Sequence, residues 1–97
     1  MPKASLLFEI KRIYDDGRVV EARIWTVPSP VRGSHHELKY SLFYGSERER
    51  LVGYDNEAGK GDHRHYKDRQ EAYAFTTVEA LVADFIADVS KIRGGDL

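Results

Sequence analysis

The first half of the chain alternates apolar and polar residues, the pattern of strands in an antiparallel sheet. In residues 4–15, apolar side chains occupy alternate positions from Leu6 to Ile10, which predicts a strand with those side chains on one face. Residues 18–27 carry a second such pattern. Asp16-Gly17 lies between them, a pair that tolerates the positive φ angles of a two-residue turn. We therefore expect an antiparallel hairpin.

A two-residue turn also fixes the register of this hairpin. Both faces of the predicted hairpin carry apolar residues, so the pattern leaves open which face meets the rest of the core. Directly opposed residues of opposite charge stabilise a pair of strands. The expected opposed pairs are Phe8 with Trp25, Leu6 with Val27 and, as a charge pair, Arg12 with Glu21.

The middle of the chain predicts further strands. Pro28-Ser29-Pro30 ends the hairpin because proline lacks the N–H group that a strand donates, and we expect residues 28–36 to be irregular. Residues 38–44 alternate leucine and tyrosine with other residues, which predicts a third strand. Residues 48–55 predict a fourth strand, and the short apolar segment 72–75 predicts an edge strand.

The last part of the chain carries a helical period. Apolar residues in the segment 76–93 recur at the spacing of one helical face, and charged residues such as Asp88 are expected to point elsewhere. Thr76 and Glu79 match a capping box at the helix start, and Gly94-Gly95 follows its end. The apolar positions are Val78, Leu81, Val82, Phe85, Ile86 and Val89.

These elements predict one α+β domain that spans residues 1–97. The expected architecture is a meander of four to five antiparallel strands with one C-terminal helix on one face, because the apolar stripe of the helix needs a partner. The sheet would occupy residues 4–55 and 72–75, the helix residues 76–93, and a long loop residues 54–70.

Composition narrows the class of protein. The chain has no cysteine, which excludes disulfides, thiolate metal sites and a cysteine nucleophile. No apolar run approaches 18 residues and no signal-peptide stretch follows Met1, so we expect a cytoplasmic protein. The net charge of −1 excludes a strongly basic polyanion binder. Any contact with nucleic acid must therefore use a local patch.

The segment 54–66, YDNEAGKGDHRHY, carries the candidate chemistry. His63 and His65 can transfer protons near neutral pH. Lys60 and Arg64 can stabilise the charge of a phosphorane-like transition state. Two histidines and a cation are the minimum for metal-free RNA cleavage, in which the ribose 2′-hydroxyl is the nucleophile. If the segment is extended, the histidines share one face and Arg64 lies on the other.

Two other interpretations of this segment stay open. Its charged residues could form solvated ion pairs that have no function. Alternatively, His63 and His65 could bind zinc or manganese with Asp55 or Asp62, helped by His35-His36, although nothing fixes a third ligand.

Glycine and tyrosine residues complete the candidate loop. Gly59 and Gly61 let backbone amides approach an anion closely. Tyr54 and Tyr66 bracket the loop and could stack on a base, although packing in the sheet explains tyrosines equally well.

The sequence resembles the TumE family of small bacterial toxins over nearly its whole length. The resemblance implies a growth-inhibiting toxin that is neutralised by a helix-turn-helix antitoxin protein encoded nearby. The chain departs from the family at Lys67-Asp68-Arg69-Gln70, where members often have a glycine-rich turn. The segments that carry the resemblance are IWTVPSPVRGSHHELKYSLFY, YDNEAGKGDHRHY with its GKG-x-HRH core, and EAYAFTTVEALVADFIADV.

The leading hypothesis is therefore a bacterial toxin that acts on RNA as a metal-independent endoribonuclease with no cofactor. His63 and His65 would supply acid and base in an order left open, while Lys60 and Arg64 would hold the scissile phosphate. The alternative is a non-catalytic module whose basic loop docks a protein or a nucleic acid, and a homodimer is left open. The supporting residues are Asp55 or Asp62, which would orient a histidine, and Gly59 and Gly61, which would shape the loop.

Overall fold

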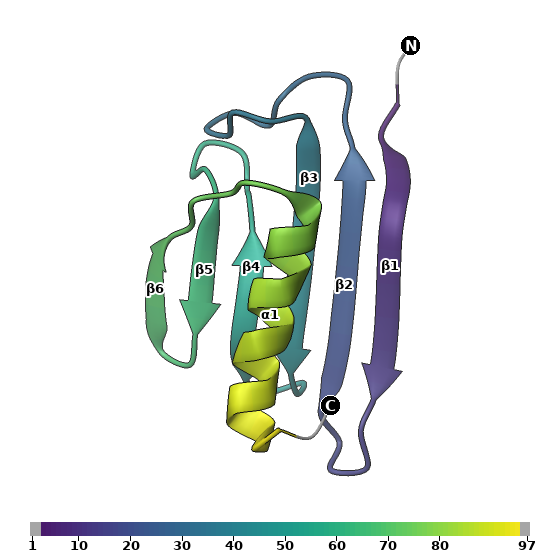
Figure 1. The fold of residues 1–97 in the computed structure, drawn as a ribbon, viewed down its shortest axis with the longest axis vertical. Helices are drawn as coiled ribbons and strands as arrows, with labels where there is room; N and C mark the ends of the chain where they lie inside the picture. Colours follow the sequence, from purple (N-terminus) through teal and green to yellow (C-terminus); the bar gives the residue numbers. More distant parts are fainter. Residues whose placement is uncertain (1–2, 96–97) are drawn as a thin grey trace.

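The computed structural model, which describes residues 3–95, consists of one antiparallel sheet and one helix that crosses a single face of it (Figure 1). The strands follow one another in sheet order β1-β2-β3-β4-β5-β6, so the predicted α+β meander with a C-terminal helix is confirmed, with six strands in place of four to five. The elements are β1 (Ser5–Ile13), β2 (Val19–Thr26), β3 (Leu38–Gly45), β4 (Arg50–Asp55), β5 (His63–Tyr66), β6 (Arg69–Ala72) and α1 (Val78–Arg93).

The loop between β1 and β2 has three residues, Asp15 to Gly17, and the predicted two-residue turn is wrong. Tyr14 N donates to Arg18 O at 2.8 Å and closes the hairpin, and Gly17 N donates to Tyr14 O at 3.0 Å. Gly17 has φ 86°, the left-handed conformation that the last position of such a loop requires. The extra loop residue shifts the pairing of the two strands by one.

The shifted register overturns the predicted cross-strand pairs. Glu21 lies opposite Lys11, with Lys11 Nζ 3.7 Å from Glu21 Oε2, so the expected pair with Arg12 is wrong. The register also changes near the start of β1, between Leu6 and Phe8. The observed pairs are Phe8 with Ile24, Leu6 with Trp25, Lys11 with Glu21 and Arg12 with Val20.

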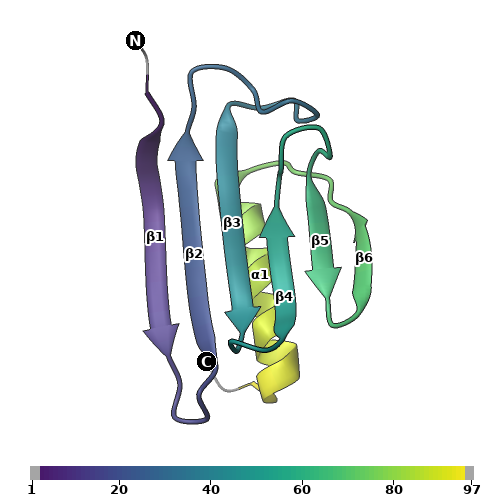
Figure 2. The same ribbon diagram turned by 180° about the vertical axis from the view of Figure 1, so that it is seen from behind.

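The core lies between α1 and the face of the sheet that carries the alternate apolar residues of β2, β3 and β4. Leu81, Phe85 and Val89 of the predicted stripe are buried, but Ile86 remains 41% exposed because it faces the margin of the covered area. Figure 2 shows the opposite face of the sheet, which carries no helix. The buried apolar residues of the sheet include Val20, Ala22, Ile24, Tyr40, Leu42, Tyr44, Val52 and Tyr54.

The helix begins one residue later than its capping signal predicted. Thr77 is the N-cap, with extended backbone and a side-chain oxygen that accepts from Ala80 N at 3.0 Å, so the expected cap at Thr76 is wrong. Gly94 follows the helix in the left-handed conformation, as predicted, and its N–H group donates to Ser90 O.

Two short strands lie within the segment that the sequence predicted to be a loop. β5 and β6 pair with each other: His63 lies opposite Ala72 at one end, and Tyr66 lies opposite Arg69 at the other. The turn between them carries a positive φ of 56° at Lys67. The predicted edge strand at 72–75 is correspondingly wrong beyond Ala72. No helix in the described residues is long and apolar enough to cross a bilayer.

Candidate functional site

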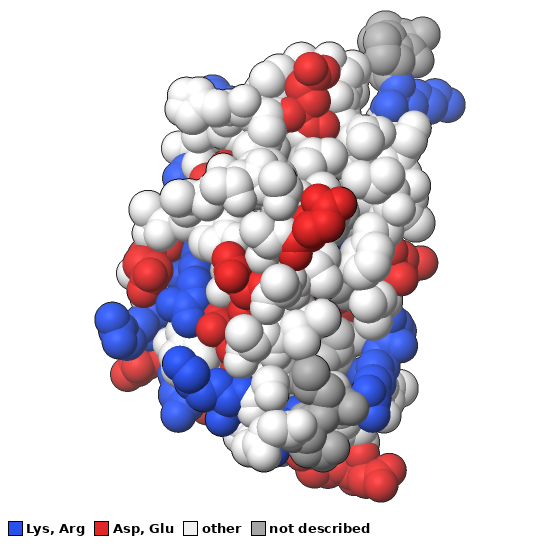
Figure 3. Space-filling model, viewed as in Figure 1, with Lys and Arg blue, Asp and Glu red and all other residues white. Residues whose placement is uncertain are grey.

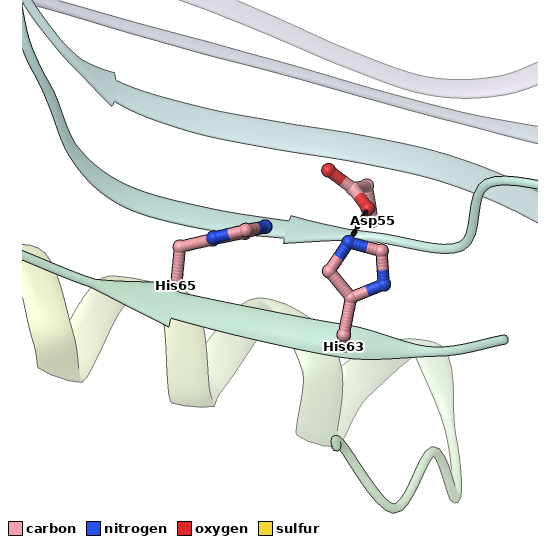
Figure 4. Close-up of side chains that lie close together, drawn as sticks. All are labelled: Asp55, His63 and His65. Atoms are coloured by element: carbon pink, nitrogen blue, oxygen red, sulfur yellow. Dashed lines mark ion pairs between the residues drawn. The ribbon is translucent and has the colours of Figure 1, made fainter. Parts of the chain in front are cut away.

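The pairing of β4 with β5 gathers Asp55, His63 and His65 on the face of the sheet that faces away from α1. Asp55 lies opposite His63, and Gly53 lies opposite His65. Side chains alternate between the faces of a strand, so the neighbouring Arg64 points to the helix side. This confirms the predicted division of the two histidines from Arg64. Figure 4 shows the three site side chains reaching towards one another across the two strands.

His63 is held with an oxygen atom at each of its ring nitrogens. Nδ1 lies 3.1 Å from the carbonyl oxygen of Gly61, and Nε2 lies 2.6 Å from Asp55 Oδ1. The contact with Asp55 is an ion-pair contact and not a well-aligned hydrogen bond. Either ring nitrogen can carry a proton, and an imidazolium ring would carry one on each. The His63 ring therefore lies between two oxygen atoms, one of which belongs to a carboxylate.

His65 is held in the opposite way. Its Nδ1 lies 2.9 Å from the Nη2 of Arg50, and a guanidinium group can only donate, so Nδ1 accepts and the ring proton lies on Nε2. Burial lowers the pKa of His65 below its ordinary value, and the positive charge of Arg50 lowers it further. The centres of the two imidazole rings are 5.0 Å apart, so a histidine held by a carboxylate and a histidine held by a guanidinium lie side by side.

Arg50 reaches the histidines through two local features of β4. The register of β3 and β4 skips Leu51, a bulge that sets Arg50 opposite Gly45. A Cβ on Gly53 would lie 2.8 Å from Arg50 Cδ and 3.6 Å from His65 Cδ2, so the arginine occupies the space that glycine leaves. Arg50 was not among the residues predicted from the sequence. A glycine inside a predicted strand was the available signal, since it marks a bulge or a close approach.

We refer to Arg50, Asp55, His63 and His65 as the histidine site. Asp55 and the two histidines offer ligand atoms within 4.8 Å of one another, so these three could hold a divalent ion. An ion on Nε2 of His65 would require its proton to move to Nδ1, where it would meet the Arg50 donor. The ion would also repel the guanidinium charge. The hydrogen bonds therefore fit proton transfer better than metal binding.

Lys60 lies at the rim of the histidine site. Its ammonium group is exposed and lies 3.4 Å from Glu57 Oε2. Together with His63 it lines a shallow depression of about 500 Å³ beside β6. Lys60 can therefore approach a ligand at the site from its open side.

The structure does not bring Arg64 to the histidines. Its guanidinium forms two hydrogen bonds with Asp88 of α1, at 2.8 and 2.9 Å, and one with Tyr54 Oη at 2.9 Å. These bonds to Asp88 raise the pKa of Arg64 above its ordinary value. They also bury Asp88, against the expectation that this residue points away from the core. Arg64 links the sheet to the helix and is not placed to hold a phosphate at the histidine site.

Asp62 belongs to a separate hydrogen-bond network where two loops meet. It accepts from Ser34 Oγ at 2.5 Å, His36 Nε2 at 2.6 Å and Tyr40 Oη at 2.7 Å. Burial would raise the pKa of Asp62, but these bonds outweigh it and hold that pKa below its ordinary value. His36 is thereby committed away from the histidine site, while His35 lines a nearby hollow. Asp55, and not Asp62, is the carboxylate that orients a catalytic candidate.

The glycines of the candidate segment serve the contact between loops 28–37 and 56–62. Gly59 N donates to Arg32 O at 2.7 Å, and a Cβ on Gly33 would lie 2.7 Å from Gly61 N. Both Gly59 and Gly61 have positive φ angles, 87° and 75°. The two glycines shape the loop as expected. The group that approaches them closely is the backbone of loop 28–37, in place of the anion that the sequence predicted.

The two tyrosines that bracket the segment pack on the helix side. Tyr54 is 2% exposed and donates to Asp88 Oδ2. Tyr66 is half-buried, and the Arg64 guanidinium lies 5.1 Å from its ring centre. Both rings are explained by packing, and neither faces the histidine site.

Residues 3–93 match the protein family described as Toxin TumE. The chain belongs to the TumE toxin family. The match confirms the resemblance, and it covers both the sheet and the helix. Membership of a toxin family implies an antitoxin partner. No curated protein and no solved structure matches the chain.

Proposed function

We propose that this TumE family toxin cleaves RNA as a metal-independent endoribonuclease and that its active site is the histidine site. The observation that carries the proposal is the pairing of two histidines, His63 against the carboxylate of Asp55 and His65 against the guanidinium of Arg50. RNA cleavage by attack of the ribose 2′-hydroxyl requires a neutral base that accepts a proton and a protonated acid that donates one. We also propose that the protein that neutralises this toxin is a helix-turn-helix antitoxin.

In the proposed reaction, the RNA phosphate binds the Arg50 guanidinium, a charge-assisted contact that draws the arginine away from His65. Nδ1 of His65 is then free to accept the proton of the ribose 2′-hydroxyl. The 2′-oxygen attacks phosphorus, the bond from phosphorus to the 5′-oxygen breaks, and His63 Nε2 gives its proton to that leaving oxygen. The products are a 2′,3′-cyclic phosphate and a 5′-hydroxyl.

The remaining residues of the site support these two steps. Asp55 lies 2.6 Å from His63 Nε2 and fixes the position of the ring, and because this contact is not an aligned hydrogen bond, the Nε2 proton stays available to the leaving oxygen. Lys60 is exposed at the rim, where it adds positive charge near the phosphate. Arg50 takes the role that the sequence analysis gave to Arg64.

The helix-bearing side of the molecule is a poorer candidate surface for RNA. Figure 3 shows Lys and Arg on that side mostly at the lower left and along the β1 margin, with small patches at the upper left, while Asp and Glu lie among them and over the centre. Such mixed charge gives a polyanion little net attraction. The proposal therefore places RNA on the face that carries no helix.

The test is cleavage of a labelled single-stranded RNA by purified variants. We expect His63→Ala and His65→Ala each to lower the rate by about 10²–10⁴-fold, the contribution of a positioned proton-transfer group. His35→Ala, which removes a histidine outside the site, is the matched control and should cleave at the wild-type rate. Activity should persist in a chelator. An RNA with 2′-deoxyribose at the cleavage position should stay intact.

The pH profile of cleavage tests the residue roles separately. We expect a bell-shaped profile because His65 must be neutral and His63 must be protonated. The lowered pKa of His65 places the acidic limb below the ordinary histidine value of about 6.5. If a chelator abolishes activity and one divalent ion restores it, the histidines are metal ligands. If both alanine variants remain fully toxic in cells at equal expression, the docking module replaces the enzyme.

A further inference from the structure

A second hollow opens on the same face of the sheet, next to the histidine site. It has a volume of about 780 Å³ and lies over the turn between β3 and β4. Arg50 lines this hollow and also binds His65, so the two places share one side chain. The residues that line it are Gly17, Val19, Phe43, Ser46, Glu47, Arg48, Glu49 and Arg50.

Phe43, Gly53 and His65 form one row across β3, β4 and β5. Phe43 pairs with Gly53, and Gly53 pairs with His65, so the phenyl and imidazole rings rise from the same face. Neighbouring strands are about 4.8 Å apart, which sets the two backbone positions about 10 Å apart. Gly53 has no side chain, and the Arg50 side chain lies over it. An aromatic ring, a guanidinium and a histidine thus follow one another along this row.

We propose that the hollow is a nucleobase subsite for the RNA nucleotide next to the scissile phosphate. The base stacks on the half-buried ring of Phe43 while its phosphate binds Arg50 beside His65. Single-stranded nucleic acid is commonly bound by such pairs of an aromatic platform and a cation. The place of this subsite relative to cleavage rests on the proposed function, whereas base binding by the hollow does not.

The rim of the hollow favours guanine. Arg48 can donate to the O6 and N7 acceptors of guanine, the commonest specific pairing of an arginine with a base. Glu47 and Glu49 supply carboxylates, which only accept, and guanine presents two adjacent donors at N1 and N2. Among residues 3–95, neither of these glutamates forms an ion pair, so both carboxylates are available to a ligand.

The test measures binding of short uncleavable 2′-deoxy-substituted RNAs by fluorescence anisotropy. We expect Phe43→Ala to weaken binding between about fivefold and about a hundredfold, the effect of losing one stacked base. Phe43→Tyr keeps the ring and should bind as the wild type does. Trp25→Leu is the matched control, since Trp25 lies on the same face but outside the hollow. Its affinity should be unchanged, with folding of each variant checked by circular dichroism.

Base preference gives a second, independent measurement on variants with little risk to folding. The wild type should bind oligonucleotides that contain guanine more tightly than matched ones that lack it. Glu47→Gln combined with Glu49→Gln should remove that preference without loss of the general affinity. Equal binding by wild type and Phe43→Ala, or no preference for guanine, would overturn the subsite.

The two proposals fail in different ways. If His63→Ala and His65→Ala cleave normally while Phe43→Ala weakens binding, the nuclease mechanism is wrong and the base subsite stands. If the histidine variants lose cleavage while Phe43→Ala binds and cleaves like the wild type, the subsite is wrong and the nuclease proposal stands.

Discussion

Arg50 and Arg64 are residues of one type on paired strands, yet they point to opposite faces of the sheet. Arg64 is fixed by Asp88 and Tyr54, so its charge is neutralised where the sheet meets the helix. Arg50 has only a histidine nitrogen as its partner at the histidine site, and that contact leaves its charge available to an anion. The face of the sheet to which the side chain points, and not the residue type, therefore decides whether an arginine stabilises the fold or can bind a ligand.

This difference can be measured with two matched substitutions. Arg64→Gln should lower the free energy of unfolding by about 3 kcal/mol, because it leaves Asp88 as a buried charge without its cation. Arg50→Gln should leave stability within about 0.5 kcal/mol. The Arg50 variant should instead lose about 0.7 from the slope of log affinity for single-stranded RNA against log salt. Chemical denaturation measures the stability of both variants, and salt titrations measure their RNA binding. A loss of stability in Arg50→Gln with a loss of salt dependence in Arg64→Gln would contradict both expectations.

At the residue scale, alternation alone predicted that His63 and His65 share a face and that Arg64 does not. Arg50 was not predicted, because its position depends on a bulge and on the space left by Gly53, which lies opposite His65 on the neighbouring strand. Gly59 and Gly61 were recognised as loop-shaping, but the segment against which they pack lies far away in the sequence. Such contacts between distant loops leave no periodic pattern.

At the element scale, periodicity predicted α1 and the strands β2 to β4 because each buries a series of apolar residues. It also predicted β1 from its alternating sequence, although the side chains of β1 stay exposed except for the half-buried Phe8. β5 and β6 escaped prediction because their sequences, HRHY and RQEA, are polar. Backbone pairing, of β5 with β4 and of β6 with β5, holds them in the sheet. The register of the first hairpin was missed for another reason. Asp15-Asp16-Gly17 fits a two-residue or a three-residue loop, and only the closed hydrogen bonds distinguish them.

The start of α1 provides a prediction at this scale. Thr77→Ala should lower the free energy of unfolding by about 0.5–2 kcal/mol, because the side chain that accepts from Ala80 N is lost. Thr76→Ala is the control and should change it by less than about 0.5 kcal/mol. Thermal and chemical denaturation measure both. A larger loss at Thr76 would mean that the helix begins one residue earlier in solution.

For the whole molecule, the single helix makes the two faces of the sheet unequal. One face carries the core under α1, while the other carries the histidine site and the hollow beside Phe43. The residues that stabilise the fold and the residues proposed to act on RNA therefore lie on opposite faces of the sheet. Substitutions on the helix side should change stability and leave the rate per folded molecule intact.

Two adjacent residues of α1 test how that side is closed. Phe85→Ala should cost about 3–5 kcal/mol, since its ring is 3% exposed and packs against the core. Ile86→Ala should cost less than about 1 kcal/mol because that side chain is 41% exposed. Denaturant titrations give both values, with RNA cleavage by the folded variants as the parallel readout. Similar losses at both positions would mean that the helix packs by a different face.

The meander order of the strands also sets the order in which the chain can fold. Each strand pairs with its neighbour in sequence, so successive hairpins close short loops at low entropic cost. The contacts of α1 are of another kind: Asp88 binds Tyr54 across 34 positions, and Arg93 reaches Asp16 across 77. During synthesis the sheet can therefore assemble strand by strand, while its apolar face stays in water until α1 is made.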